Sequence, residues 1–145
     1  MGRSGLVNVF NLKIMACNRT FYDGKSEILI VPLRDGEKAV MANHEDVVLA
    51  TEIGELKLRT SEGEELHAVC GPGFLQMINN RALLLVTSIE KPEEIDVLRA
   101  KEAMLRAKEE LLHKQSMMEY EHSQASLSRA MSRLKISKKY QIKGF

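Results

Sequence analysis

The sequence predicts an α+β protein, in which an N-terminal antiparallel β-sandwich is followed by a C-terminal antiparallel hairpin of two helices. The first observation is a change of composition, because all but one of the 9 glycines lie before Pro92 and residues 93–143 contain neither Gly nor Pro. The second is periodicity, since short alternating apolar stretches precede Pro92, whereas Ala, Leu, Met, Glu, Lys and Arg recur at helical spacing after it. We therefore expect domains at 1–91 and 92–145.

The first domain carries the signals of many short strands. Phe10, Leu12 and Ile14 alternate with polar residues, as in a strand with one buried face. Residues 28–31 and 47–49 are continuous apolar runs, which we expect to be strands covered on both faces. Further strands are expected at 55–59, 66–70, 74–77 and 83–89, with a hairpin turn at 60–63 and another turn at Asn79-Asn80. No crossover helix fits between them, which favours a sandwich or flattened barrel.

The second domain is expected to contain two helices. Residues 91–94, Lys-Pro-Glu-Glu, have the Pro and the carboxylates that suit the first turn of a helix. Residues 116–119, Ser-Met-Met-Glu, match a capping box, which predicts that a second helix begins there.

Heptad spacing predicts how these two helices pack. Leu98, Leu105 and Leu112 are seven residues apart on the first helix, and its alanines at 100, 103 and 107 form a strip that lets another helix approach closely. On the second helix, residues 120, 127 and 134 share one heptad phase and residues 124 and 131 another. We expect the helices to zip together along these residues as an antiparallel hairpin.

Composition excludes several classes of protein. No apolar run approaches the roughly 18 residues that a membrane-spanning helix needs, so the chain is expected to be soluble. Residues 1–5 lead into strand-like sequence without the apolar core of a secretory signal, which favours the cytosol. Cys17 and Cys70 lack the spacing of a zinc or redox motif, and we expect reduced, half-buried thiols.

Basic residues are concentrated at the C-terminal end of the chain. The net charge of +1 argues against a dedicated nucleic-acid binder. After Glu121, however, the chain has no acidic residue and six basic ones. An acidic partner or an anion is therefore expected at this end.

The sandwich sequence gives no support for catalysis. Residues 70–73, Cys-Gly-Pro-Gly, lack the Lys and Ser/Thr of a phosphate-binding loop and favour a tight turn. His44 and His67 have no partner at metal-ligand spacing, and no nucleophile motif occurs. We therefore expect no catalytic and no metal site, and interpret this domain as a docking module.

The hairpin sequence places several arginines together. If the bend is centred near Gln115, position 99 lies opposite about position 132, so Arg129 and Arg133 face Asp96 and Arg99. Arg106 lies two turns beyond Arg99, and Glu90 immediately precedes the helix. Guanidinium groups in excess of carboxylates suggest a polyphosphate site. The alternative is a hairpin surface with exposed ion pairs, each contributing roughly 0.2–1 kcal/mol.

Specific motifs decide between these alternatives. Residues 95–100, Ile-Asp-Val-Leu-Arg-Ala, with Arg106 and the later segment 129–134, resemble the C-terminal domain of the epsilon subunit of bacterial F-type ATP synthase. Gly71-Pro72-Gly73-Phe74-Leu75 is similar to the Gly-Gly-Phe-Leu segment of the family's β-sandwich, and residues 36–44 lie where a Gly-rich segment ending in His is expected. Lys38-Ala39-Val40 and Glu45-Asp46 depart from the family pattern. The resemblance runs from about residue 10 to 137.

The resemblance implies a nucleotide site and a rotor role. ATP would be a regulatory ligand, with magnesium left open, and the family's nucleotide contacts fall on Glu90, Asp96, Arg99, Arg106, Arg129 and Arg133. The chain would be a non-catalytic central-stalk subunit of a proton- or sodium-translocating enzyme. It would couple c-ring rotation to the gamma subunit and regulate ATP hydrolysis through a mobile helical hairpin.

The resemblance also implies partners and a location. In an inhibitory state the helices would meet the beta subunits, and the complex would lie at the cytoplasmic face of the bacterial plasma membrane, with this chain peripheral to it. A different class of function would be an adaptor whose basic tail binds nucleic acid or an anionic membrane surface. The tail has little aromatic interleaving, which disfavours that alternative.

Overall fold

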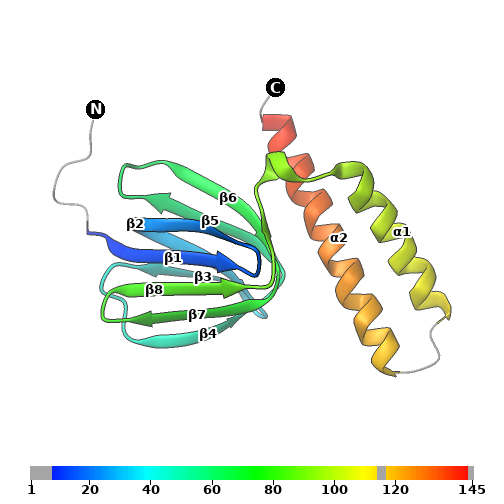
Figure 1. Cartoon of the computed structure of the whole chain (residues 1–145), viewed down its shortest axis with the longest axis horizontal. Coiled ribbons are helices and arrows are strands. Elements are labelled where there is room, and N and C mark those ends of the chain that lie inside the picture. The colour runs from blue at the N-terminus through cyan, green and yellow to red at the C-terminus, as the bar shows by residue number, and fades with distance from the viewer. Residues whose placement is uncertain (1–7, 114–116, 144–145) are drawn as a thin grey trace. The chain divides into compact units, whose positions relative to one another are not determined.

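The computed structural model describes residues 8–113 and 117–143, and the chain divides into two compact units, residues 1–89 and 90–145 (Figure 1). The first unit is built of strands and the second of helices, so the predicted α+β fold is confirmed. The division falls two residues before the expected boundary between 91 and 92.

Nine strands form one continuous sheet whose order is β4-β7-β8-β1-β2-β5-β6-β9, with β3 paired to β2. Their bounds are β1 Phe10–Ala16, β2 Arg19–Leu33, β3 Gly36–Met41, β4 Val47–Thr51, β5 Gly54–Thr60, β6 Glu65–Cys70, β7 Gly73–Ile78, β8 Arg81–Val86 and β9 Ile89–Glu90. The predicted hairpin between β5 and β6 is confirmed by its register, which places Leu58 opposite Leu66. One pair, β1 with β8, is parallel.

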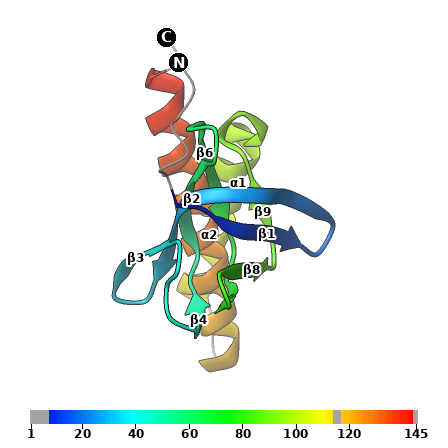
Figure 2. The same ribbon diagram turned by 90° about the vertical axis from the view of Figure 1, so that its left-hand side faces the viewer.

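Strand β2 lets this single sheet fold over into two layers. It is 15 residues long, pairs with β1 through its first half, and pairs with β3 and β5 through its second half. Its register with β5 shifts between Ser26 and Ile28, which is the local irregularity of a β-bulge and bends the strand. The turn that joins β1 to β2 is seen at the right in Figure 2.

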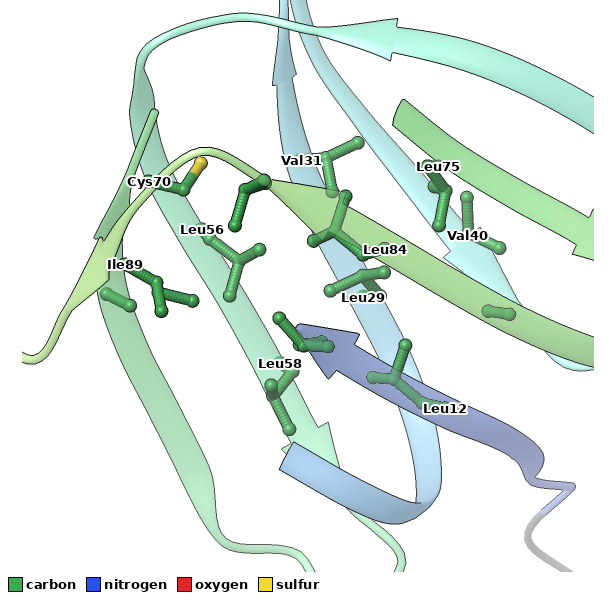
Figure 3. Packing of buried hydrophobic residues seen from close by; sticks show 14 of the residues in the cluster. Leu12, Leu29, Val31, Val40, Leu56, Leu58, Cys70, Leu75, Leu84 and Ile89 are labelled. Carbon is green, nitrogen blue, oxygen red and sulfur yellow. The ribbon is translucent and has the colours of Figure 1, made fainter. Parts of the chain in front are cut away.

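The core lies between the two layers. Leu12 from β1 and Leu84 from β8 point toward Leu29 from β2 and Leu56 from β5, and all four side chains are almost fully buried (Figure 3). The alternation read from the sequence therefore marks the inward faces correctly for β1 and β5.

The prediction that residues 28–31 and 47–49 are covered on both faces is wrong. Ile28 and Ile30 are only half-buried, and Val48 is 65% exposed. Each run is continuous in the sequence because apolar residues also occupy the outer face of the sandwich. Strand β3 and the N-terminal half of β2 were not predicted from the sequence.

Gly73 shows why the predicted turn after Cys70 needs glycine. Gly73 pairs with Val86, and a Cβ atom at position 73 would lie 1.9 Å from the carbonyl oxygen of Leu85. No side chain fits at that distance, so β7 approaches β8 closely only with glycine at this position.

The helical unit contains a 3-10 turn η1, Pro92–Glu94, and helices α1, Val97–His113, and α2, Met117–Lys143. Residues 91–94 were expected to open the first helix, and this is wrong by about one turn. The backbone N–H of Lys91 donates to Glu94 Oε1 at 3.1 Å, which closes η1, and Ile95 is extended. Helix α1 begins only after Asp96, which caps it. Ser116 of the expected second capping box lies outside the described residues.

Small residues join the two helices, and the predicted leucine zipper is wrong. Ala100 and Ala107 of α1 are buried, as are Ser123 and Ala130 of α2. The hydroxyl of Ser123 donates to Glu110 Oε2 at 3.1 Å and fixes the antiparallel register. We call these four buried residues the seam.

The leucines that were expected to zip the hairpin lie elsewhere. Leu98, Leu105 and Leu112 are 67%, 58% and 82% exposed, and Met131 of α2 is 51% exposed. Leu127 and Leu134 are half-buried, so they flank the seam. The alanine strip, rather than the leucine heptad, selects the packed face of α1.

Candidate functional site

Arg133 and Glu90 form the best-defined polar pair among the six predicted site residues. Arg133 Nη2 donates to Glu90 Oε2 at 3.0 Å, and Nε lies 2.8 Å from Oε1 as an ion pair that lacks hydrogen-bond alignment. The two side chains are 21% and 30% exposed, so the contact is partly shielded from solvent. A guanidinium that engages both oxygens of one carboxylate is well oriented.

Asp96 and Arg99 are also brought together, but through the backbone. Asp96 Oδ1 accepts the backbone N–H of Arg99 at 3.1 Å, and its carbonyl oxygen accepts the N–H of Ala100 at 3.0 Å. Asp96 is thus the N-cap of α1, which its position just before the helix explains. The side chain of Arg99 remains exposed.

Three of the predicted arginines keep exposed side chains. Within residues 8–113 and 117–143, the structure gives Arg99, Arg106 and Arg129 no carboxylate partner within 4.0 Å. The expected contact of Arg129 and Arg133 with Asp96 is not formed, because Asp96 caps α1 and Arg133 binds Glu90. The hairpin therefore carries cationic groups in excess of its anionic partners.

The antiparallel register brings these arginines to similar heights along the hairpin. With Ser123 level with Glu110, equal rise along both helices places Arg99 level with Leu134 and Arg106 level with Leu127. Arg133 is therefore within one residue of the level of Arg99, and Arg129 within two residues of that of Arg106. The predicted register, position 99 opposite about position 132, agrees with these levels to within two residues, a rise of about 3 Å that a glutamate side chain can span.

A second candidate surface lies on the sandwich and was not found from the sequence. The outer face of β4, β7 and β8 exposes Val48, Phe74, Ile78 and Leu85, at 65%, 62%, 40% and 46%. Phe74 lies directly opposite Leu85 in the register, and Ala50 of β4 lies opposite Phe74. We call these four exposed residues the sandwich patch. In the sequence, this patch could have been found from the apolar residues of β4, β7 and β8 that alternate with the core residues and therefore point to the outer face.

The described residues contain no group of three or more His, Cys, Asp or Glu that could hold a metal ion. No helix in that part of the chain is long and apolar enough to cross a membrane. Cys17 is exposed and Cys70 is buried, and both are free thiols. Burial raises the pKa of the Cys70 thiol to about 12.

Comparison with known proteins gives the family. Residues 9–92 match the ATP synthase delta/epsilon chain β-sandwich domain, and residues 93–138 match the long α-helix domain of the same chain. The ATP synthase epsilon chain of Ruminiclostridium cellulolyticum is 37% identical over 86% of this chain and 92% of its own. That of Caldicellulosiruptor bescii is 36% identical over 88% and 93%.

Two solved structures have the same fold. A chain of the Euglena gracilis mitochondrial ATP synthase, in an assembly with F1 and the c-ring, superposes with a TM-score of 0.75 at 16% identity, covering 91% of this chain and 83% of its own. A chain of the Tetrahymena thermophila central stalk and c-ring gives 0.67 at 11%, covering 88% and 95%.

A β-sandwich followed by a helical hairpin thus defines a non-catalytic stalk subunit of a rotary ATP synthase. The chain belongs to the ATP synthase delta/epsilon chain family, as an epsilon subunit of the F-type central stalk.

Proposed function

We propose that this epsilon subunit couples c-ring rotation to the gamma subunit through its sandwich and regulates ATP hydrolysis through a hairpin that binds ATP. The observation that carries the regulatory part is the set of exposed Arg99, Arg106 and Arg129 beside the oriented Arg133. Planar guanidinium groups bind phosphate oxygens through paired hydrogen bonds, so a triphosphate is the ligand that this charge excess suits.

In the proposed site each residue has a distinct part. Arg99, Arg106 and Arg129 bind the phosphates, because no described carboxylate competes for them. Glu90 orients Arg133, and Asp96 orients the first turn of α1 that carries Arg99.

The seam makes the hairpin a suitable mobile element. Alanine and serine bury little apolar surface, and each buried CH2 group contributes only about 0.8 kcal/mol. The closed hairpin is therefore held more weakly than a leucine-packed pair. ATP that binds only the closed form shifts the population toward it by differential affinity, and the opened helices contact the beta subunits and hinder hydrolysis.

The sandwich patch is the proposed docking surface for the gamma subunit. Exposed Val48, Phe74, Ile78 and Leu85 form an apolar face of the kind that marks a protein interface. The solved relatives of similar fold come from central-stalk and c-ring assemblies, which supports gamma and the c-ring as partners. In this role the chain lies peripherally at the cytoplasmic face of the bacterial plasma membrane.

Isothermal titration of the full chain with ATP tests the regulatory part. We expect saturable binding that is weakened in the Arg129→Ala, Arg133→Ala double variant, which should also inhibit ATP hydrolysis less in the assembled enzyme. The matched control is Lys135→Ala, an exposed basic residue of α2 outside the proposed contacts. Absence of binding heat at millimolar ATP would remove the sensor role and leave mechanical coupling.

A further inference from the structure

Helix α1 has two apolar faces, and the hairpin uses only one of them. Ala100 and Ala107 belong to the seam, whereas Leu98, Leu105 and Leu112 are exposed. Figure 1 shows α2 running alongside α1. At about 100° per residue, the three leucines fall within about 20° of one line, which lies roughly opposite the alanines. We call these three exposed leucines the leucine stripe.

Charged residues of opposite sign border the leucine stripe. Lys101 and Lys108 lie along one edge, and Glu102 and Glu109 lie along the other, by the same helical spacing. All four are exposed, and none forms an ion pair with another residue that the structure describes. The stripe therefore has one cationic and one anionic border, and neither is neutralised within the described chain.

This arrangement is complementary to itself in one orientation. When two copies of α1 meet face to face in parallel, a two-fold axis along the helices sets the lysine edge of one copy against the glutamate edge of the other. In the antiparallel orientation, lysines would meet lysines and glutamates would meet glutamates, which is unfavourable. The borders thus select a partner with the same pattern and fix its direction.

We propose that the leucine stripe is a self-association surface, through which a second copy of this chain pairs in parallel along α1. Leu98, Leu105 and Leu112 meet their own equivalents, and Lys101 and Lys108 lie beside Glu102 and Glu109 of the partner. Three leucines from each copy cover far less than the roughly 800 Å² per partner of a standard interface. The pairing is therefore weak, depends on concentration, and belongs to the chain outside the assembled enzyme.

Sedimentation of the full chain over about 10 µM to 1 mM, at low salt, tests this surface. We expect the average mass to rise toward that of a dimer with concentration, and Leu105→Lys to abolish the rise. Met131→Lys, the same kind of change at an exposed position of α2, should not. A chain that stays monomeric throughout, or an association that Leu105→Lys leaves intact, would overturn the proposal. Loss of association on Phe74→Lys, with Leu105→Lys harmless, would also do so.

A charge exchange tests the borders separately. The Lys101→Glu, Lys108→Glu variant has two acidic edges, and the Glu102→Lys, Glu109→Lys variant has two basic edges, so each alone should remain monomeric. Mixed together they should restore the dimer. If either variant associates like the wild-type chain, or if the mixture stays monomeric, the complementarity argument is wrong.

A cross-link tests the direction of pairing. With dissolved oxygen as the oxidant, Leu112→Cys in a Cys17→Ser background should form an intermolecular disulfide readily, since parallel pairing brings the two equivalent positions together. Preferential cross-linking of Leu98→Cys to Leu112→Cys in a mixture would indicate antiparallel pairing and contradict the proposal.

Discussion

Enlarging one residue of the seam should open the hairpin by a predictable amount. Ala107 is 3% exposed, and it lies on the face of α1 that Glu110 turns toward Ser123. Ala107→Leu adds three carbon atoms where the helices have room for one, and overpacking of this kind costs about 1–3 kcal/mol. Leucine is nearly as good a helix former as alanine, so this cost comes from packing.

The cost converts directly into an opening equilibrium. Since 1.4 kcal/mol is a factor of ten, 1–3 kcal/mol corresponds to an opening constant raised by roughly 5- to 150-fold. Amide hydrogen exchange along α1 measures that constant, because the amides of a helix exchange through its openings. We expect faster exchange in Ala107→Leu by that factor, and weaker apparent binding of ATP where the closed form becomes the minor one.

A matched control separates the packing effect at the seam from any other effect of replacing alanine by leucine. Ala125 is exposed on α2, so Ala125→Leu makes the same substitution outside the seam. Its exchange rates should match those of the wild-type chain. If Ala107→Leu exchanges as slowly as Ala125→Leu, the seam does not hold the two helices together and the reasoning about a weakly closed hairpin fails.

Three further outcomes follow from the structure. Glu90→Ala should destabilise the helical unit by about 1.5–3 kcal/mol in denaturant, as expected for the loss of a hydrogen bond between charged groups. Unchanged unfolding would show that the pair is not formed. Gly73→Ala should lower the unfolding midpoint of the sandwich severely, whereas Gly24→Ala, whose added methyl group meets only a flexible tyrosine ring, should be tolerated. Equal effects of the two substitutions would refute the close approach of β7 to β8. At pH 8 a thiol reagent should modify Cys17 at once and Cys70 only on unfolding, because burial raises the pKa of the Cys70 thiol to about 12. Prompt modification of both thiols would contradict the burial of Cys70.

Alternation predicted the inward faces of the sandwich well, because a period of two leaves few choices for Leu12 and Leu56. The same alternation did not identify the inward face of strands that carry apolar residues on both faces. Val48 lies in a run that resembles a fully buried strand, and nothing local to the run states that its outer side is open. Which face is covered depends on the neighbours that the topology supplies.

The hairpin shows the same limit. A leucine heptad and an alanine strip both occur on α1, and spacing alone does not say which one packs. The small residues pack against Ser123 and Ala130, residues that apolar periodicity does not mark. The polar pair of Ser123 with Glu110 joins two helices, and neither helix by itself indicates which residue of the other lies beside it.

The contacts of the predicted site residues could not be read from the sequence. The arginine motif identified Arg99 and Arg133, whereas the partner of Arg133 lies 43 residues away at Glu90. Asp96 was expected to face an arginine, yet its position before α1 makes it a helix cap. Local capping competes with long-range pairing for the same carboxylate, and the motif does not show which prevails.

ATP should favour the closed hairpin, and a distance between the two helices measures how far the hairpin is closed. Spin labels at Lys108→Cys and Ala125→Cys, in a Cys17→Ser background, occupy exposed positions that the register places level with each other. Without ATP we predict a broad distance distribution, and with saturating ATP a single narrow one. A distribution that saturating ATP leaves unchanged would contradict the account.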